Sequence, residues 1–248
     1  MTAQQEYNTY GLELERLLLL RTSPIAVKML ESEDDIPPEA YRPMKDNGVH
    51  IAQCQAFTMS RRRKQTVAML KEDNWCWAPL VAWGLVEPPD PETIFGASFP
   101  CFEREKYIGL VTAPLSSAGF EPDMVLIYSN TAQLRNMLSA LKSKENPLVS
   151  SVFDPIDSCV YSIVPTITTG ECRITLPDPG EYERAMAGED EIIFSVPVDK
   201  LERLVSKLQR SYQQKRGYAF STQDMQPDFP RPAFYEKLFK EWGLDVKE

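Results

Sequence analysis

Apolar residues recur at helical or strand-like spacing along most of the chain and predict an alternation of helices and short strands. A helix is expected over Gln4–Leu20, and Thr22-Ser23-Pro24 ends it. The apolar run Ile25–Leu30 follows and predicts a strand. The same criteria predict strands at Thr66–Leu70 and Glu171–Leu176, and helices at about Ile51–Arg62, within Asp73–Leu85 and at about Pro232–Trp242.

Two segments of this pattern align with each other without a gap, residues 123–138 on residues 190–205. Each copy has an apolar run, a four-residue turn and a helix with apolar positions at i, i+3, i+4 and i+7, completed by Leu141 and Leu208. The alignment is explained equally well by an internal β-α repeat and by coincidence between two ordinary β-α units. Both interpretations predict strands at Val125–Tyr128 and Ile192–Val196, which we expect to share one central sheet with Ile25–Leu30.

These elements predict a mixed α/β (α+β) fold, with a central mixed sheet and flanking helices in a single domain over residues 1–248. Residues 217–248 form a Pro-rich C-terminal extension of that domain. Asp154-Pro155 has the form of an N-cap followed by a first helical residue, and the helix that it starts is expected to end before Pro165. Pro177–Gly180 predicts a turn.

Composition and charge narrow the class of protein. The chain has 248 residues, 43% of them hydrophobic and 25% charged, which is typical of a globular protein. It has no apolar run of about 18 residues and no basic-then-apolar start, so we expect a soluble cytoplasmic protein without a membrane contact. The net charge of −9 argues against a nucleic-acid partner, which needs a basic surface.

The chain has five cysteines, an odd number, and they are widely spaced, so they predict no disulfide framework. No two of them form a C-x-x-C pair, so they predict no zinc ribbon either. Four of them fall near the starts of predicted helices: Cys54, Cys76, Cys101 and Cys159. A helix N-terminus favours thiolate, the form that binds metal. One hypothesis is therefore a metal or iron–sulfur site of Cys54, Cys76 and Cys159, completed by Cys101 or by His50, in a protein of redox or cofactor-delivery function.

Other interpretations of the same residues stay open. Free cysteines are commonly small buried hydrophobic residues, which leaves a metal-free small-ligand-binding or accessory module. Arg61, Arg62 and Arg63 either bind an anionic cofactor or ligand beside the Cys54 helix, or complement the dipole at its C-terminal end. A thiol enzyme with Cys54 as nucleophile and His50 as base is a further hypothesis.

Cys172 is set apart from the other four cysteines. It alternates with Ile174 and Leu176 in a strand-like segment, so we predict a packed, unreactive thiol there.

Several short motifs, in order, resemble domain-of-unknown-function family 169, a group of uncharacterised archaeal and bacterial proteins. The resemblance covers about residues 10–210 and rests on Ser23–Lys28, Cys54-Gln55-Ala56 with Arg61–Arg63, Asn74-Trp75-Cys76 with Trp83-Gly84-Leu85, Pro122–Ile127 with Gln133, Ser158-Cys159, Thr168-Thr169-Gly170, and Gly180 with Ile193–Pro197.

The family has no established activity, so the resemblance adds no mechanism. It implies that cysteines matching Cys54, Cys76 and Cys159 recur among relatives. It also implies that many relatives have a further cysteine just before the glycine matching Gly180, where this chain has Pro179. For partners we expect a small molecule or a redox protein, with a homo-oligomer left open.

Overall fold

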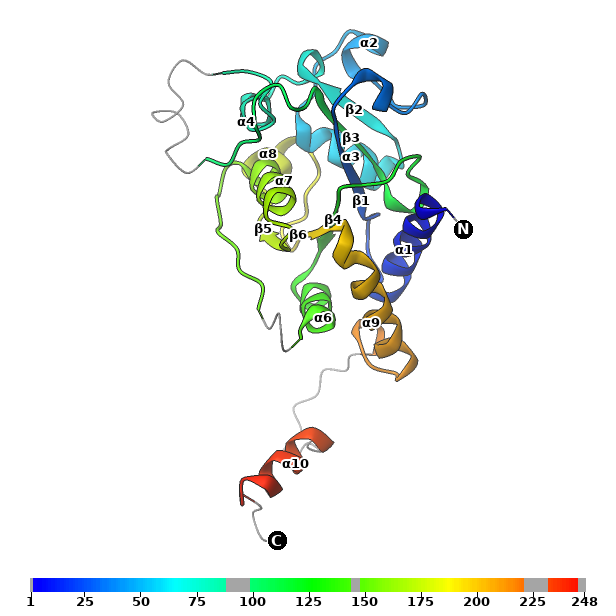
Figure 1. The fold of residues 1–248 in the computed structure, drawn as a ribbon, viewed down its shortest axis with the longest axis vertical. Coiled ribbons are helices and arrows are strands. Elements are labelled where there is room, and N and C mark those ends of the chain that lie inside the picture. Colours follow the sequence, from blue (N-terminus) through cyan, green and yellow to red (C-terminus); the bar gives the residue numbers. More distant parts are fainter. Residues whose placement is uncertain (1, 88–98, 144–147, 221–231, 245–248) are drawn as a thin grey trace.

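A six-stranded sheet forms the centre of the computed structural model, which describes residues 2–87, 99–143, 148–220 and 232–244 (Figure 1). The strand order is β2-β3-β1-β4-β6-β5, and every ladder between these strands is antiparallel. The strands span Ile25–Leu30 (β1), Val67–Leu70 (β2), Gly109–Pro114 (β3), Met124–Ser129 (β4), Arg173–Thr175 (β5) and Ile192–Pro197 (β6). The α+β class and the single central sheet are confirmed, although the sheet is antiparallel where a mixed sheet was expected.

Helices cover both faces of this sheet. The helices of the first face are α1 (Ala3–Leu18), α6 (Thr131–Leu141) and α9 (Leu201–Gln213), which pack on alternate strand residues such as Ala26, Val125 and Phe194. The helices of the second face are α3 (Gln53–Arg63), α4 (Trp77–Ala82) and α7 (Ser158–Thr169), on residues such as Val27 and Leu126. The central strands are therefore apolar on both faces, as their continuous hydrophobic runs require.

The smaller elements connect these layers. They are α2 (Pro43–Asn47) and α8 (Pro179–Arg184), with single 3₁₀ turns at Glu33–Asp35 (η1), Lys71–Asp73 (η2), Leu115–Ser117 (η3), Val198–Lys200 (η4) and Tyr218–Phe220 (η5).

The two β-α units of the aligned segments are neighbours in the sheet. β4 and β6 pair antiparallel, and Ile127 lies opposite Phe194, its own equivalent in the sequence alignment. The helices of the two units bury their apolar residues in the same core. These residues are Leu134, Met137 and Leu141 of α6, and Leu201, Leu204 and Leu208 of α9. The two units are therefore paired at equivalent positions, which both interpretations of the alignment allow.

The segment around Asp154 and Pro165 differs from the prediction. Asp154 accepts hydrogen bonds from the backbone N–H groups of Ile156 and Asp157 (both 2.8 Å) and so closes a local turn, and α7 begins only at Ser158. The helix continues through Pro165 and ends at Gly170, whose φ of 66° is left-handed. Pro165 removes one helical hydrogen bond, but burial of Val160, Ile163 and Val164 on the sheet outweighs that loss.

Two further segments were not predicted correctly. Pro177–Gly180 is not a simple turn, because Asp178 caps α8 and Pro179 is its first residue. Strand β3 was not predicted at all, although it lies between β1 and β2 and is buried along its whole length.

The C-terminal extension contains α10 (Ala233–Glu241), which has no buried residue and is drawn apart from the body in Figure 1. Residues 221–231 and 245–248 of that extension lie outside the described part of the chain. Within the described ranges, no helix is long and apolar enough to cross a membrane.

Candidate functional site

Three cysteines from distant parts of the sequence line one cavity of about 200 Å³ on the second face of the sheet. They are Cys54, Cys76 and Cys159, which come from the first residues of α3, the N-cap of α4 and the second residue of α7. Helix α3 contacts α8, and α4 contacts α7. The remaining lining residues are Gln53, Trp77, Ala78, Ile156, Asp157, Asp178, Pro179, Gly180, Glu183 and Arg184.

Backbone pairing brings Cys54 and Cys76 together. Ile51 forms an isolated bridge with Asn74, in which the Ile51 N–H donates to the Asp73 carbonyl (3.0 Å) and the Trp75 N–H donates to the Ile51 carbonyl (3.3 Å). The chain then enters α3 and α4 side by side. Cys54 and Cys76 consequently pack in one small cluster with Ala52 and Ala185.

A buried carboxylate joins the third cysteine to the same place. Asp178, the N-cap of α8, accepts hydrogen bonds from the Glu181 N–H (2.9 Å), the Ser158 hydroxyl (2.8 Å) and the Ser158 N–H (3.3 Å). These bonds hold the first turn of α7 against the first turn of α8. Cys159, the next residue after Ser158, therefore lies at the cavity wall beside Pro179.

Gln53 is the unexpected member of the cavity. Its side chain is 1% exposed, and neither its amide nitrogen nor its amide oxygen has a hydrogen-bond partner in the described structure. A buried amide without partners is costly, by about 1–3 kcal/mol for each unsatisfied group. A polar ligand in the cavity would remove that cost.

Burial raises the pKa of all three thiols, opposite to the direction expected from their helix N-termini. Burial raises the pKa of Cys54 to about 12, with Glu181 and Asp178 adding to the shift and Arg184 opposing it. Burial also raises the pKa of Cys76, and that of Cys159 well above its ordinary value. Desolvation and nearby carboxylates therefore outweigh the helix dipoles. The thiols need a cation in the cavity before they become thiolates.

Acidic and basic groups face each other at the cavity mouth. Burial, followed by repulsion from Asp154 and Asp178, raises the pKa of Asp157 to about 6. Arg184 lies with its guanidinium 5.0 Å from the centre of the Trp75 ring. A Cβ on Gly180 would clash with the Arg184 Nη2. The absence of a side chain at Gly180 therefore allows the guanidinium to lie against the backbone.

The other two proposed ligands are not part of this cavity lining. Cys101 has an exposed side chain whose sulfur donates to the Phe99 carbonyl at 3.8 Å. His50 is exposed and precedes α3, which begins at Gln53, so it shares no helix face with Cys54. The thiol–histidine pair of the enzyme hypothesis therefore has no geometric support here.

Cys172 lies on the opposite face of the sheet, in the core formed with α6 and α9. Burial raises its pKa to about 11, as predicted for a packed thiol. The alternation that was expected to bury its neighbours is incomplete, because Ile174 is only partly buried and Leu176 is 46% exposed.

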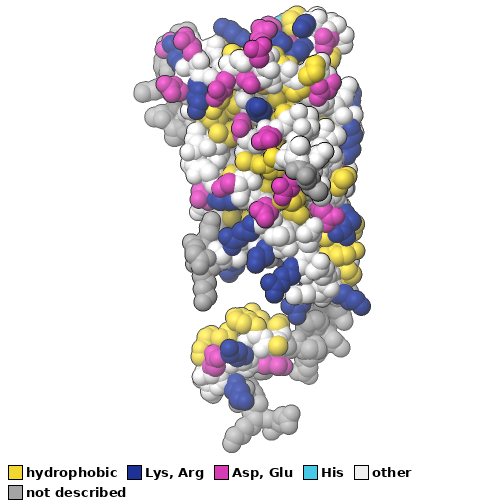
Figure 2. All heavy atoms as spheres, turned by 45° about the vertical axis from the view of Figure 1, so that its right-hand side comes forward, with side chains coloured by type: hydrophobic (Ala, Val, Ile, Leu, Met, Phe, Trp, Pro, Cys, Tyr) yellow, Lys and Arg dark blue, Asp and Glu magenta, His cyan; other side chains and the backbone are white. Residues whose placement is uncertain are grey.

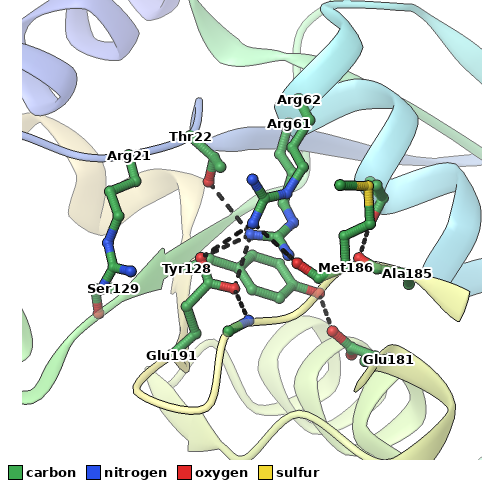
Figure 3. Close-up of polar contacts among 12 residues, drawn as sticks. Arg21, Thr22, Arg61, Arg62, Tyr128, Ser129, Glu181, Ala185, Met186 and Glu191 are labelled. Atoms are coloured by element: carbon green, nitrogen blue, oxygen red, sulfur yellow. Dashed lines mark hydrogen bonds and ion pairs between the residues drawn. The ribbon is translucent and has the colours of Figure 1, made fainter. Parts of the chain in front are cut away.

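Arg61 lies in the protein interior and already has its counterion. Its Nη1 donates to both carboxylate oxygens of Glu191 (2.9 and 3.0 Å), and its Nη2 donates to the Met186 carbonyl (3.1 Å). The guanidinium carbon is 4.0 Å from the centre of the Tyr128 ring (Figure 3). Such a neutralised, desolvated cation holds the loop before β6 to α3 and offers no free charge to an anion.

The other two arginines of that run are peripheral to the cavity. Arg62 donates to the Met186 carbonyl at 2.9 Å, and Arg63 is exposed. None of Arg61, Arg62 and Arg63 is among the described residues that line the cysteine cavity. The proposed anion site beside the Cys54 helix is therefore not formed by Arg61, and the dipole interpretation describes Arg62 and Arg63 better.

Glu181 connects this arginine network to the cysteine cavity. Its carboxyl group accepts a hydrogen bond from the Tyr128 hydroxyl (2.8 Å) and lies 2.6 Å from the Ser158 hydroxyl, whose one hydrogen it shares with Asp178. Burial raises the pKa of Glu181 to about 7; the hydrogen bond with Ser158 opposes this shift, and repulsion from Asp178 adds to it.

Sequence reasoning missed Gln53, Asp178 and Arg184. Asp178-Pro179 has the same N-cap and first-residue form that was assigned to Asp154-Pro155, so that signal was present. The unpartnered state of Gln53 has no signal in a single sequence. Pro179, at the position where the resemblance implies a cysteine in many relatives, lines the cavity with the other three positions.

Among the described residues, no three His, Cys, Asp or Glu side chains are arranged around a position for a single metal ion. The cavity therefore brings three thiols together without forming a finished one-ion site.

A model of the DUF169 family, described as uncharacterised ArCR, matches residues 13–207 of the chain. No curated protein and no solved structure shows significant similarity to this chain.

Proposed function

We propose a function for this chain, which belongs to the DUF169 family. The cavity of Cys54, Cys76 and Cys159 binds an iron–sulfur cluster, and the protein acts in redox chemistry or cofactor delivery. The observation behind this proposal is that three thiols, separated by 22 and 83 residues in the sequence, line the same small cavity.

The ligand chemistry supports a soft metal centre. Cysteine thiolates are the usual ligands of iron–sulfur clusters and are among the ligands of zinc. Because burial raises the pKa of all three thiols, metal binding would release protons and become tighter as pH rises. When bound, a cluster supplies one-electron transfer or an iron with an open position.

The dimensions of the cavity favour a cluster over a single ion. A volume of about 200 Å³ is more than ten times the ~10–15 Å³ in which one water fits by the same measure. The absence of a one-ion arrangement in the described residues agrees with this preference. Three thiolates would leave one iron of a four-iron cluster without a cysteine, and the polar lining residues Gln53 and Asp157 are the candidates for its fourth ligand.

The protein's own groups fit such a centre. Arg184 lies near Cys54 and would offset part of the negative charge of a thiolate-bound cluster. The unpartnered Gln53 amide offers a donor to a cluster sulfur or an acceptor to a bound ligand. Trp77 and Ile156 line the mouth, where they would limit the access of water.

Anaerobic reconstitution with iron and sulfide tests the proposal directly. We expect brown protein with iron and acid-labile sulfide in equal amounts, and loss of both on replacement of Cys54, Cys76 or Cys159 by serine. The matched controls are Cys101→Ser and Cys172→Ser, which remove a thiol outside the cavity and should retain the full iron content.

Equal iron loss in all five serine variants, or in none, would contradict the proposal. Colourless iron-free wild-type protein under the same conditions would leave the metal-free ligand-binding module as the better account. Zinc binding without iron or sulfide, lost in the same three variants, would replace the cluster by a single-ion site.

A further inference from the structure

A second and larger cavity lies on the first face of the sheet, opposite the cysteine cavity. Its volume is about 430 Å³, within the usual range of about 300–1,000 Å³ for small-molecule sites. The walls are α6, the start of α9, the residues before β5 and the segment at Leu148 and Val149. The cavity shares no lining residue with the cysteine cavity.

Helix α6 contributes two parallel stripes to this cavity. Leu134, Leu138 and Leu141 are spaced i, i+4 and i+7 and form an apolar wall that continues in Cys172. Thr131, Arg135, Ser139 and Lys142 form a polar stripe beside it. The cavity is thus apolar along its length and polar along one edge.

The polar edge is strongly cationic. Arg135 from α6 and Lys142 at its C-cap line the cavity with Lys200 and Arg203 from the start of α9, and Glu171 is the one carboxylate among the described lining residues. Lys200 is paired with Glu171. Arg135, Lys142 and Arg203 are exposed and form no ion pair within the described part of the chain.

This concentration of positive charge is unusual for a chain with a net charge of −9. Figure 2 shows Lys and Arg side chains gathered on the lower part of the body, over the region where Figure 1 places α6 and α9. Within the described part of the chain these three cations have no counterion and repel one another, and an anion between them would reduce that repulsion.

We propose that this cavity binds an amphiphilic anion, with an aliphatic chain along Leu134, Leu138 and Leu141 and a carboxylate or phosphate head group at Arg135 and Arg203. An apolar ligand without charge would leave the cations unpaired. A small anion without a tail would leave Leu148, which is 79% exposed, and the partly buried Leu138 in contact with water. Only a ligand with both parts satisfies the two stripes.

The head group and the tail are tested separately by calorimetric titration at low salt with four probes. They are decanoate, decyl phosphate, decylammonium and inorganic phosphate. We expect decanoate and decyl phosphate to bind, decylammonium to bind at least tenfold more weakly, and inorganic phosphate to give no measurable heat. The stronger of the two anionic probes identifies the head group.

Charge-reversal variants locate the site. Arg135→Glu and Arg203→Glu should each weaken the binding of decanoate or decyl phosphate about three- to tenfold. This is the effect expected when an exposed charge pair is removed and its charge is reversed. Arg210→Glu is the matched control, since it makes the same change in net charge on an exposed residue of α9 that does not line the cavity. It should leave the affinity within twofold of wild type.

Equal binding of decanoate and decylammonium would overturn the proposal, because it would show apolar adsorption alone. Equal weakening by Arg203→Glu and Arg210→Glu would overturn it as well, since only the overall charge would matter. Binding of inorganic phosphate as tight as decyl phosphate would show an anion site without a tail site. No binding of either anionic amphiphile would also refute it.

Discussion

Replacing Arg61 by methionine is expected to lower the free energy of unfolding by about 3–5 kcal/mol, because the buried Glu191 carboxylate loses its hydrogen-bonded cation and keeps only the partly exposed Arg62 at 3.9 Å. The Arg61 side chain is 0% exposed and that of Glu191 is 4% exposed, so water screens neither charge. The substitution also removes the Arg61 bond to the Met186 carbonyl and the contact with the Tyr128 ring.

A double-mutant cycle separates the ion pair from the loss of packing. Glu191→Met alone should also be strongly destabilising, since it leaves the Arg61 guanidinium buried and unpaired. Arg61→Met with Glu191→Met removes both charges and should cost much less than the sum of the two single variants. Arg63→Met is the control, with an exposed side chain and an expected change below about 0.5 kcal/mol.

Urea unfolding followed by tryptophan fluorescence measures these differences, because Trp83 is only 1% exposed in the folded state. The result that refutes the interpretation is an Arg61→Met variant no less stable than Arg63→Met. Arg61 would then be a free cation, and its assignment to an anion site would have to be restored.

Three further predictions concern other parts of the fold. The pKa of Glu181 is about 7 in the folded chain and 4.5 in the unfolded chain, so the free energy of unfolding should fall by about 3 kcal/mol as pH rises through that window. Urea titrations of Glu181→Gln should lack this fall. An identical pH profile for the variant and wild type would refute the prediction. Gly109→Ala should cost about 1–3 kcal/mol in the same assay, because a Cβ there would meet the Met69 carbonyl oxygen at 2.2 Å and force β2 from β3; a wild-type midpoint would contradict this. In timed alkylation followed by mass spectrometry, the exposed Cys101 should react first and the buried Cys172 far more slowly, and the reverse order would contradict their assigned burial.

Much of the fold could be predicted because its strands are hydrophobic runs of ordinary length. β1 was predicted at its observed bounds, and β4 and β6 within about one residue. The aligned segments led to two neighbouring β-α units because periodicity reports which face of a helix or strand is buried. Strand β3 was missed because Gly109–Pro114 combines a glycine, a threonine and a proline with few large apolar residues, and its pairing with β1 and β2 is set by tertiary contacts.

The candidate site could be predicted only in part for a related reason. Cys54, Cys76 and Cys159 were grouped by their position near helix starts, and the structure brings them to one cavity. Their protonation was predicted wrongly, because burial depends on the tertiary packing around Asp178 and Glu181, which sequence spacing does not report. The same limit applies to Arg61, whose partner Glu191 is 130 residues away in the chain.

Anomalous scattering at the iron edge, from crystals of anaerobically reconstituted protein, tests the central claim most directly. The account predicts strong iron density in the cavity lined by Cys54, Cys76 and Cys159, with each of the three sulfur atoms bonded to an iron of the cluster. An iron peak bound elsewhere, for example at Cys101, or iron-loaded crystals in which these three thiols have no metal neighbour, would contradict it.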